Sequence, residues 1–234
     1  MFKKILKSKW GRFRLIRNLV IGWISHSLQD RDRGEIAVHL AVEIIVFGVI
    51  LIVMCSSGSS SLIALGSAFL IAHTMMFLLD GQLHCYIHDG IPSMQNAGID
   101  EAVMYLSLVR EAYSKTDSVF AVLVYGSFCR QEFRRRSDLD IRVIRRPGVW
   151  SLVRAIFIGF RLRYLSIPKS LPTDLLIVDS MEFVRKQMRE DEHPVVLVLQ
   201  GGFQVPEAGL NFESIIADPS LATKNTAFRT DKKQ

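Results

Sequence analysis

The chain has 234 residues, enough for one large domain or for a small domain with an accessory region. Hydrophobic residues make up 49% of it, and the mean hydropathy of +0.24 is high for a wholly soluble protein. The formal charge of +6 suits phosphorylated substrates, anionic lipid or nucleic acid. Three cysteines without a CxxC pair argue against a disulfide framework and against a zinc site, so a reducing compartment is expected.

The first segment, residues 1–35, is basic. Within Met1–Arg33, lysines and arginines alternate with tryptophan, phenylalanine and aliphatic residues. This mixture is typical of a helix that lies on an anionic membrane surface, and a solvated basic tail is the alternative. A signal peptide is not expected, because the charged region is long and no small-residue cleavage site follows a short apolar core.

Two long apolar stretches follow, Ile36–Cys55 and Leu62–Leu79, separated by a turn of serines and glycine. About twenty apolar residues cross a bilayer, and neither stretch has a polar stripe. The sequence therefore predicts an α-helical transmembrane hairpin over residues 36–80, with a buried helical pair as the alternative. Both ends of such a hairpin lie on one side, and the preceding basic residues predict that this side is cytoplasmic. We expect a cell-membrane protein whose remaining domain lies at the cytoplasmic face.

Ionisable residues within or just after the hairpin have simple expected roles. Those inside it, His39, Glu43 and His73, are not expected to form a site. His39 and Glu43 lie near the entry end and are expected to reach the membrane interface. Residues 81–98 are expected to be a linker. His84 and His88 have the i, i+4 spacing of a helical metal site, but the glycines and proline around them favour a loop.

Residues 99–205 alternate between helical and strand patterns. Helices are expected at Ile99–Lys115, 127–136, Trp150–Leu165 and Ser180–Arg189, and strands at Phe120–Tyr125, 137–144, Leu175–Val178 and Val195–Leu199. This order predicts an α/β domain, a mixed sheet with flanking helices, after the hairpin. The arginines of Trp150–Leu165, including Arg163, are expected on a solvated face or at phosphate or lipid head groups. Residues 206–234 are expected to form a C-terminal tail, loose from Asp218 onward.

The most informative stretch runs from Val122 to Ile144. Gly126-Ser127 follows the first strand, where a missing Cβ permits close approach and a helix start can bind an anion. The next stretch alternates at period 2, so Asp138, Asp140 and Arg142 share one face of a strand. Two adjacent carboxylates repel each other, and Mg²⁺ is typically held by such a pair together with substrate phosphates. The sequence predicts a polyphosphate over Gly126-Ser127 beside Mg²⁺, for which Mn²⁺ could substitute.

Gly126-Ser127, ten further residues and then Asp138-Leu139-Asp140, preceded by Ser137, resemble the signature of the nucleotidyltransferase superfamily that includes DNA polymerase β. The chain most resembles the minimal nucleotidyltransferases of bacteria and archaea, over roughly residues 100–200. The resemblance implies a nucleotidyltransferase fold with a third acidic residue on a later strand. Asp174, at the start of an apolar run, is the residue that matches.

By this resemblance the protein is an enzyme that moves a nucleoside monophosphate from a nucleoside triphosphate (NTP) to a hydroxyl or phosphate acceptor and releases pyrophosphate. The implied catalytic and metal-binding residues are Asp138, Asp140 and Asp174. The implied nucleotide-binding residues are Gly126, Ser127, Arg130, Ser137 and Arg142, and Arg134 to Arg136 are further candidates for triphosphate contact. The acceptor is open: lipid-linked, sugar phosphate or protein. Family members are commonly soluble and paired with a helical partner, whereas this chain begins with an apparent anchor to a lipid bilayer.

Two alternatives remain. One is a non-catalytic nucleotide-sensing or regulatory module at the membrane, although such a module would not need three carboxylates. The other is template-directed polymerisation, which the chain is too short to support with thumb-like and finger-like domains. Nucleic acid is therefore not an expected partner.

Overall fold

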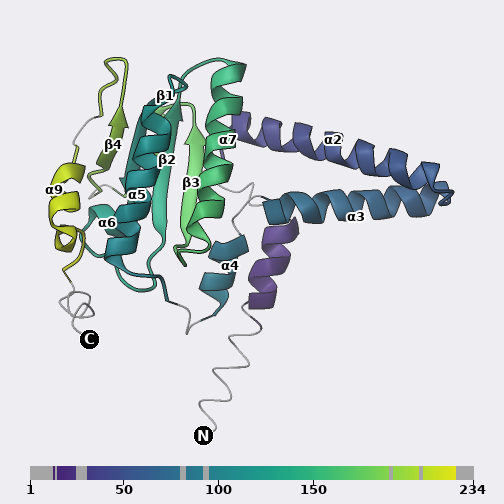
Figure 1. Cartoon of the computed structure of the whole chain (residues 1–234), viewed down its shortest axis with the longest axis horizontal. Coiled ribbons are helices and arrows are strands. Elements are labelled where there is room, and N and C mark those ends of the chain that lie inside the picture. The colour runs from purple at the N-terminus through teal and green to yellow at the C-terminus, as the bar shows by residue number, and fades with distance from the viewer. Residues whose placement is uncertain are drawn as a thin grey trace, which may run out of the picture.

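The computed structural model describes residues 13, 15–24, 31–79, 83–91, 95–189, 192–205 and 208–224. These residues form an α/β domain and a pair of long helices that projects from one side of it (Figure 1). The fold class expected from the sequence is confirmed at this level: a mixed sheet with flanking helices, and two apolar helices near the N-terminus.

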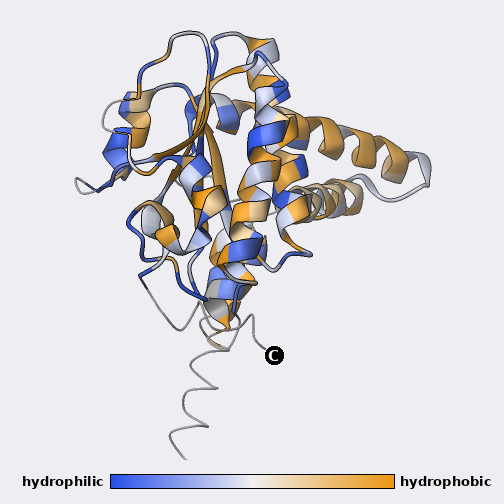
Figure 2. Cartoon of the chain, turned by 60° about the vertical axis from the view of Figure 1, so that its left-hand side comes forward, coloured by the Kyte–Doolittle hydropathy of each residue, from blue (hydrophilic) through white to orange (hydrophobic). Residues whose placement is uncertain are grey.

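The projecting pair consists of α2 (Arg33–Ser56) and α3 (Ser61–Leu79). Both are long and apolar enough to span a membrane. Both helices are apolar along most of their length, as their largely orange ribbons in Figure 2 show, and Ile44, Ile52 and Leu62 are each more than 60% exposed. Residues at every fourth position of α3 are buried instead, and the first three are alanines: Ala64, Ala68, Ala72 and Met76. Small residues at this spacing allow two helix backbones to pack closely.

Two short helices flank the base of this pair. Residues 15–24 are helical, and Trp23 Nε1 donates a hydrogen bond to Thr74 Oγ1 of α3 at 3.1 Å. The rest of the predicted basic segment, residues 1–12, 14 and 25–30, lies outside the described residues. The expectation of a loop after the hairpin is wrong over Leu83–Gly90, which forms α4. The breakers at Gly81, Gly90 and Pro92 stand at or beyond the ends of this helix, where they limit its length without preventing it.

The sheet has four strands in the order β3-β2-β1-β4. They are β1 (Val119–Tyr125), β2 (Leu139–Arg145), β3 (Thr173–Val178) and β4 (Val195–Leu199). β1 pairs antiparallel with both β2 and β4, and β2 pairs parallel with β3. β3 therefore forms one edge of the sheet and β4 the other.

The two faces of the sheet are covered differently. Helices α5 (Ile99–Ser114) and α7 (Val149–Ser166) pack over the face that carries Leu139, Ile141 and Val143 and form the main core. The short helix α8 (Met181–Gln187) covers only part of the opposite face, where Ile144, Leu176 and Val178 make a smaller cluster. The period-2 alternation of β2 thus places Asp140 and Arg142 on the less covered face.

Two other expectations about the domain need correction. The helix expected over 127–136 is only α6 (Gly126–Cys129), because the chain turns at Gln131, whose φ is +61°. The expected tail is packed on the domain over residues 208–224, including the first part of the stretch expected to be loose, since α9 (Phe212–Ala217) and the 3₁₀ helix η1 (Pro219–Ala222) bury Phe212, Ile215 and Ala222 in the main core. Residues 225–234 lie outside the described residues.

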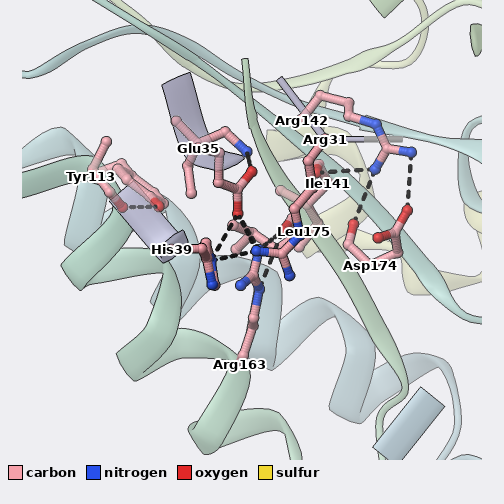
Figure 3. A network of polar contacts seen from close by, with 11 residues as sticks. Arg31, Glu35, His39, Tyr113, Ile141, Arg142, Arg163, Asp174 and Leu175 are labelled. Carbon is pink, nitrogen blue, oxygen red and sulfur yellow. Dashed lines mark hydrogen bonds and ion pairs between the residues drawn. The ribbon is translucent and has the colours of Figure 1, made fainter. Parts of the chain in front are cut away.

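The start of α2 is built into the domain and covers the outer edge of β3 (Figure 3). Glu35 accepts a hydrogen bond from the Ile177 amide at 3.1 Å, and Asp32 accepts one from the Asp179 amide at 3.1 Å. Arg163 of α7 donates to the Leu175 carbonyl. Side chains thus satisfy backbone groups of the edge strand that would otherwise be free to pair with another strand.

The same side chains form a buried ionic network. Glu35 has no exposed surface, and it pairs with Arg31 at 3.2 Å and with Arg163 at 3.0 Å. His39, one turn further along α2, is buried beside Arg31 and against the ring of Phe160. The expectations that Arg163 lies on a solvated or head-group-binding face and that His39 reaches the membrane interface are therefore wrong. The hairpin is fixed to the domain through buried charges.

Glu43 and His73 contact each other within the hairpin. The Nδ1 atom of His73 lies 2.8 Å from the Glu43 carboxylate, and its Nε2 atom lies 2.8 Å from the carbonyl of Trp23. A carboxylate in apolar surroundings is costly unless it is paired, so these contacts account for both residues as a structural lock between α2, α3 and residues 15–24.

Candidate functional site

A cavity of about 400 Å³ opens at the end of β1 beside the start of β2. Its lining combines backbone, carboxylates and arginines: Tyr125, Gly126, Ser127, Arg130, Arg136, Ser137, Asp138, Asp140, Arg142, Val184, Gln187, Met188, Arg189 and Glu192. Seven of the eight residues predicted for the site from the sequence are in this lining, and Asp174 is the exception.

Gly126 brings the backbone and a carboxylate into contact at the floor of the cavity. Its φ is +69°, a conformation that L side chains rarely adopt. A Cβ at this position would overlap with Asp140 Oδ2 and would lie 2.9 Å from its Cγ. Only glycine fits here, so the glycine predicted from the sequence is required by the position of Asp140 itself.

Asp138 and Asp140 lie on the same side of the cavity but in different environments. Asp138 precedes β2 and is exposed, whereas Asp140 lies within β2 and is partly buried. Burial, and next the negative charge of Asp138, raise the pKa of Asp140 to about 7. A bound divalent cation would reverse this effect by favouring the ionised form.

Asp174 lies directly beside Asp140 on the neighbouring strand. The parallel pairing of β2 and β3 places the two residues in register, so their side chains leave the same face of the sheet. Asp174 Oδ2 is 2.9 Å from Arg142, which also donates to the Asp174 backbone carbonyl at 3.1 Å (Figure 3). Arg142 thus reaches both the cavity and Asp174, and it holds the third predicted carboxylate at the side of the cavity.

The lining of the cavity also contains groups that suit an anion. Ser127 Oγ is buried and has no hydrogen-bond partner among the described atoms. A buried polar oxygen without a partner is unfavourable unless a ligand or water satisfies it. Arg130 is balanced by two carboxylates, Glu192 and, at 3.3 Å, Glu132. Ser137 has a structural role as well, since its hydroxyl accepts from the Arg134 amide at 3.0 Å.

Six lining residues were not found from the sequence: Tyr125, Val184, Gln187, Met188, Arg189 and Glu192. Arg189 ends the helix predicted after the third strand, and the basic residues near it could have identified it as a candidate for anion binding. Glu192, whose side chain is only 7% exposed, lies 62 residues from its partner Arg130 and gave none. Tyr125 ends β1 opposite Asp140, a pairing that requires the sheet register.

Neither models of known protein families, nor characterised proteins, nor solved structures match this chain.

The residues of the cavity fit a magnesium ion by their chemistry. The two carboxylates on one face are hard oxygen ligands, and burial, followed by the charge of Asp138, raises the pKa of Asp140, an effect that a bound cation would oppose. Asp174 fits as a further ligand only when Arg142 releases it. Across the described ranges, no three His, Cys, Asp or Glu side chains are already gathered as a metal-binding group. For His84 and His88, whose rings are 6.5 Å apart, no third ligand stands beside them among the residues that the structure describes.

Proposed function

We propose that this protein is a membrane-anchored, metal-dependent nucleotidyltransferase. It would move a nucleoside monophosphate from an NTP to a hydroxyl or phosphate acceptor and release pyrophosphate. The observation that carries the proposal is the position of Asp138 and Asp140 against the backbone of Gly126 and Ser127, in a cavity lined by arginines. Acid pairs beside a phosphate-binding turn serve phosphoryl chemistry, in which catalysis is mostly positioning and charge neutralisation.

The cavity supplies the means to hold a triphosphate. Its volume of about 400 Å³ is within the usual range for small-ligand sites. Ser127 Oγ and the neighbouring backbone would donate to phosphate oxygens, and Arg136 and Arg189 would balance their charge. Arg130 is less free to do so, because Glu192 and Glu132 already neutralise it.

Asp138 and Asp140 would hold Mg²⁺, or Mn²⁺ in its place. When bound, the ion would neutralise negative charge on the phosphoryl oxygens. Asp140 would then be ionised at neutral pH, since the cation offsets the burial that raises its pKa. Asp174 would move from Arg142 toward the reacting groups, as a further metal ligand or as the acceptor of the proton of the attacking hydroxyl.

The apolar hairpin supports a place in the cell membrane, with the α/β domain at the cytoplasmic face where NTPs are available. Cys55 allows this to be tested, since it is exposed at the far end of α2. In sealed proteoliposomes, an impermeant maleimide should label Cys55 only from the side opposite the α/β domain. The protein used for this test carries Cys85→Ser and Cys129→Ser. Labelling from the domain side would contradict a spanning hairpin.

A nucleotide-sensing module without transfer is the second candidate. The ion pair of Arg142 and Asp174 favours it, because it occupies the carboxylate that the reaction would need. The first candidate requires this pair to open when Mg²⁺ and NTP bind, whereas the second does not.

The deciding experiment uses the full chain in lipid nanodiscs with Mg²⁺ and each of the four NTPs labelled at the α-phosphate. Membrane lipids, sugar phosphates and the protein itself are the acceptors. Transfer that is lost in Asp138→Asn/Asp140→Asn and kept in Asp179→Asn would support the transferase. Asp179 is a suitable control because it lies at the other end of β3, paired with Arg145. Mg²⁺-dependent NTP binding without transfer to any acceptor would favour the sensing module.

A further inference from the structure

The hairpin is short for a bilayer once its attachment to the domain is considered. One side of the first two turns of α2 packs against the domain, since Glu35 has no exposed surface and His39 is 3% exposed, while Arg33 and Ala37 remain exposed. The projecting part, from Leu40 to Ser56, is about 25 Å long at 1.5 Å per residue. A hydrocarbon core is about 30 Å thick, so the hairpin crosses it only if the base of the domain is drawn against the membrane.

A line of exposed aromatic residues follows the outer face of α7. Trp150, Phe157 and Tyr164 are spaced seven residues apart and therefore lie along one side of the helix, with exposed fractions of 84%, 72% and 40%. Val153, 39% exposed, lies beside them. The opposite side of α7 is buried in the main core, so this line has no role in packing the domain.

This aromatic line is continuous with the base of the hairpin. The hydroxyl of Tyr164 donates to the carbonyl of Leu78, at the end of α3, at 3.2 Å. The same end of α3 also contacts the helix of residues 15–24, through the hydrogen bond of Trp23 to Thr74. That helix has its own exposed apolar stripe, Ile16, Val20 and Ile24. Two apolar surfaces thus meet where the hairpin leaves the domain.

The charges around the line suit lipid head groups. Arg154 and Arg161 are exposed on the same outer side of α7, and their helical positions lie next to those of Trp150 and Phe157. Tryptophan and tyrosine concentrate at the membrane–water interface, and arginine beside them binds anionic head groups.

We propose that the outer face of α7, the line Trp150–Phe157–Tyr164 with its flanking arginines, lies on the surface of the membrane that the hairpin spans. The occupant is the lipid interface, because the line ends on α3 and because the short hairpin draws this side of the domain toward the bilayer. The inference rests on the membrane part of the proposed function and is independent of nucleotide transfer. Contact of α7 with the membrane would fix the orientation of the domain relative to the bilayer, with β3 as the sheet edge next to the hairpin.

The test uses nitroxide labels on the full chain in vesicles of phosphatidylcholine with phosphatidylglycerol. In a background without native cysteines, single labels are placed at Phe157→Cys, at Ile52→Cys in the hairpin and at Ile216→Cys on α9. Ile216 is the matched control, an apolar residue 40% exposed on another helix of the domain. Collision with oxygen, which concentrates in lipid, is compared with collision with a water-soluble nickel chelate.

We expect the label at 157 to gain oxygen collisions and lose nickel collisions relative to the label at 216, while the label at 52 lies deepest. Equal values at 157 and 216, with 52 in the bilayer, would overturn the contact of α7 and leave the spanning hairpin intact. A label at 52 that collides freely with nickel would overturn both. Neither result would bear on nucleotide transfer, which is measured separately on the unlabelled protein. As a second variant, Trp150→Glu/Phe157→Glu should lower the affinity of the hairpin-anchored domain for the surface, seen as restored nickel collisions at a label on Val153→Cys.

Discussion

Glu35 and Asp140 are two carboxylates with little exposure to solvent, and their surroundings differ in charge. Glu35, at the base of α2, is surrounded by Arg31, Arg163 and the amide of Ile177, so its charge is balanced within the chain. Asp140 lies beside Asp138, and burial together with that neighbour raises its pKa to about 7. The contrast separates a carboxylate whose charge is paired inside the structure from one whose surroundings favour the protonated form, as we propose for a cation site.

The largest effect is expected from breaking the balanced cluster. Glu35→Gln would leave Arg163 and Arg31 buried without their counter-charge, at a cost of about 3–5 kcal/mol in the free energy of unfolding. Thermal unfolding in detergent measures this, with Glu111→Gln as the control. Glu111 also pairs with a basic residue, Lys115, but at the surface, and its loss should leave the unfolding temperature unchanged. Equal small effects for both variants would show that the network does not hold the hairpin.

Comparing Gly126 with Gly202 separates backbone strain from the contact with Asp140. Gly126 and Gly202 both have φ of +69°, but a Cβ at Gly202 would meet nothing within 4 Å. Gly202→Ala should therefore cost only backbone strain, about 1–2 kcal/mol. Gly126→Ala adds the displacement of Asp140 and should also abolish Mg²⁺-dependent nucleotide binding, measured by calorimetry. Binding that survives in Gly126→Ala would mean that the position of Asp140 is not essential.

The raised pKa of Asp140 also predicts that the stability of the protein depends on pH. Asp140 has an ordinary pKa of 3.8 when unfolded and about 7 when folded, so without metal the folded state binds more protons between these values. Its ionisation therefore lowers the stability of the metal-free protein as the pH rises from about 4 to about 7. Asp140→Asn removes this penalty, and it should be more stable than the natural chain at pH 8 by about 1–3 kcal/mol. The difference should vanish near pH 4 and reverse at pH 8 when Mg²⁺ is added. A difference that is the same at both pH values would contradict the assignment.

The smallest effect is expected at the link between the cavity and Asp174. Arg142→Gln releases Asp174 from its ion pair and removes a positive charge beside Asp140. Mn²⁺ binding without nucleotide should become tighter, while binding of NTP should become weaker. Arg145→Gln is the matched control, since Arg145 pairs with Asp179 at the other end of β3. If the two variants bind Mn²⁺ equally, Arg142 does not regulate access to Asp174.

The features of the site that depend on neighbouring residues could be predicted from the sequence. The alternation of Asp138, Leu139 and Asp140 identifies both the strand and the face that carries the acids, and the glycine after the first strand identifies the turn. The register that sets Asp174 beside Asp140 agrees with its predicted place on a later strand. These features depend on neighbours within a few residues.

The contacts between residues far apart in the sequence could not be predicted. Glu35 and Arg163 are 128 residues apart, and nothing in either segment indicates that α2 covers the edge of β3. For the same reason Glu192 was missed in the cavity, and Arg163 was assigned to a solvated or head-group-binding face. A buried ion pair depends on which helices pack together, and a single-sequence pattern of charge does not contain that information.

Binding of Mn²⁺, followed by electron paramagnetic resonance on the full chain in nanodiscs with a non-hydrolysable NTP analogue, is the decisive test of the proposed acid pair. We expect nucleotide-dependent Mn²⁺ binding that is lost in Asp138→Asn/Asp140→Asn and kept in Asp179→Asn. Mn²⁺ binding that is absent from the natural chain, or unchanged in the double variant, would contradict this proposal.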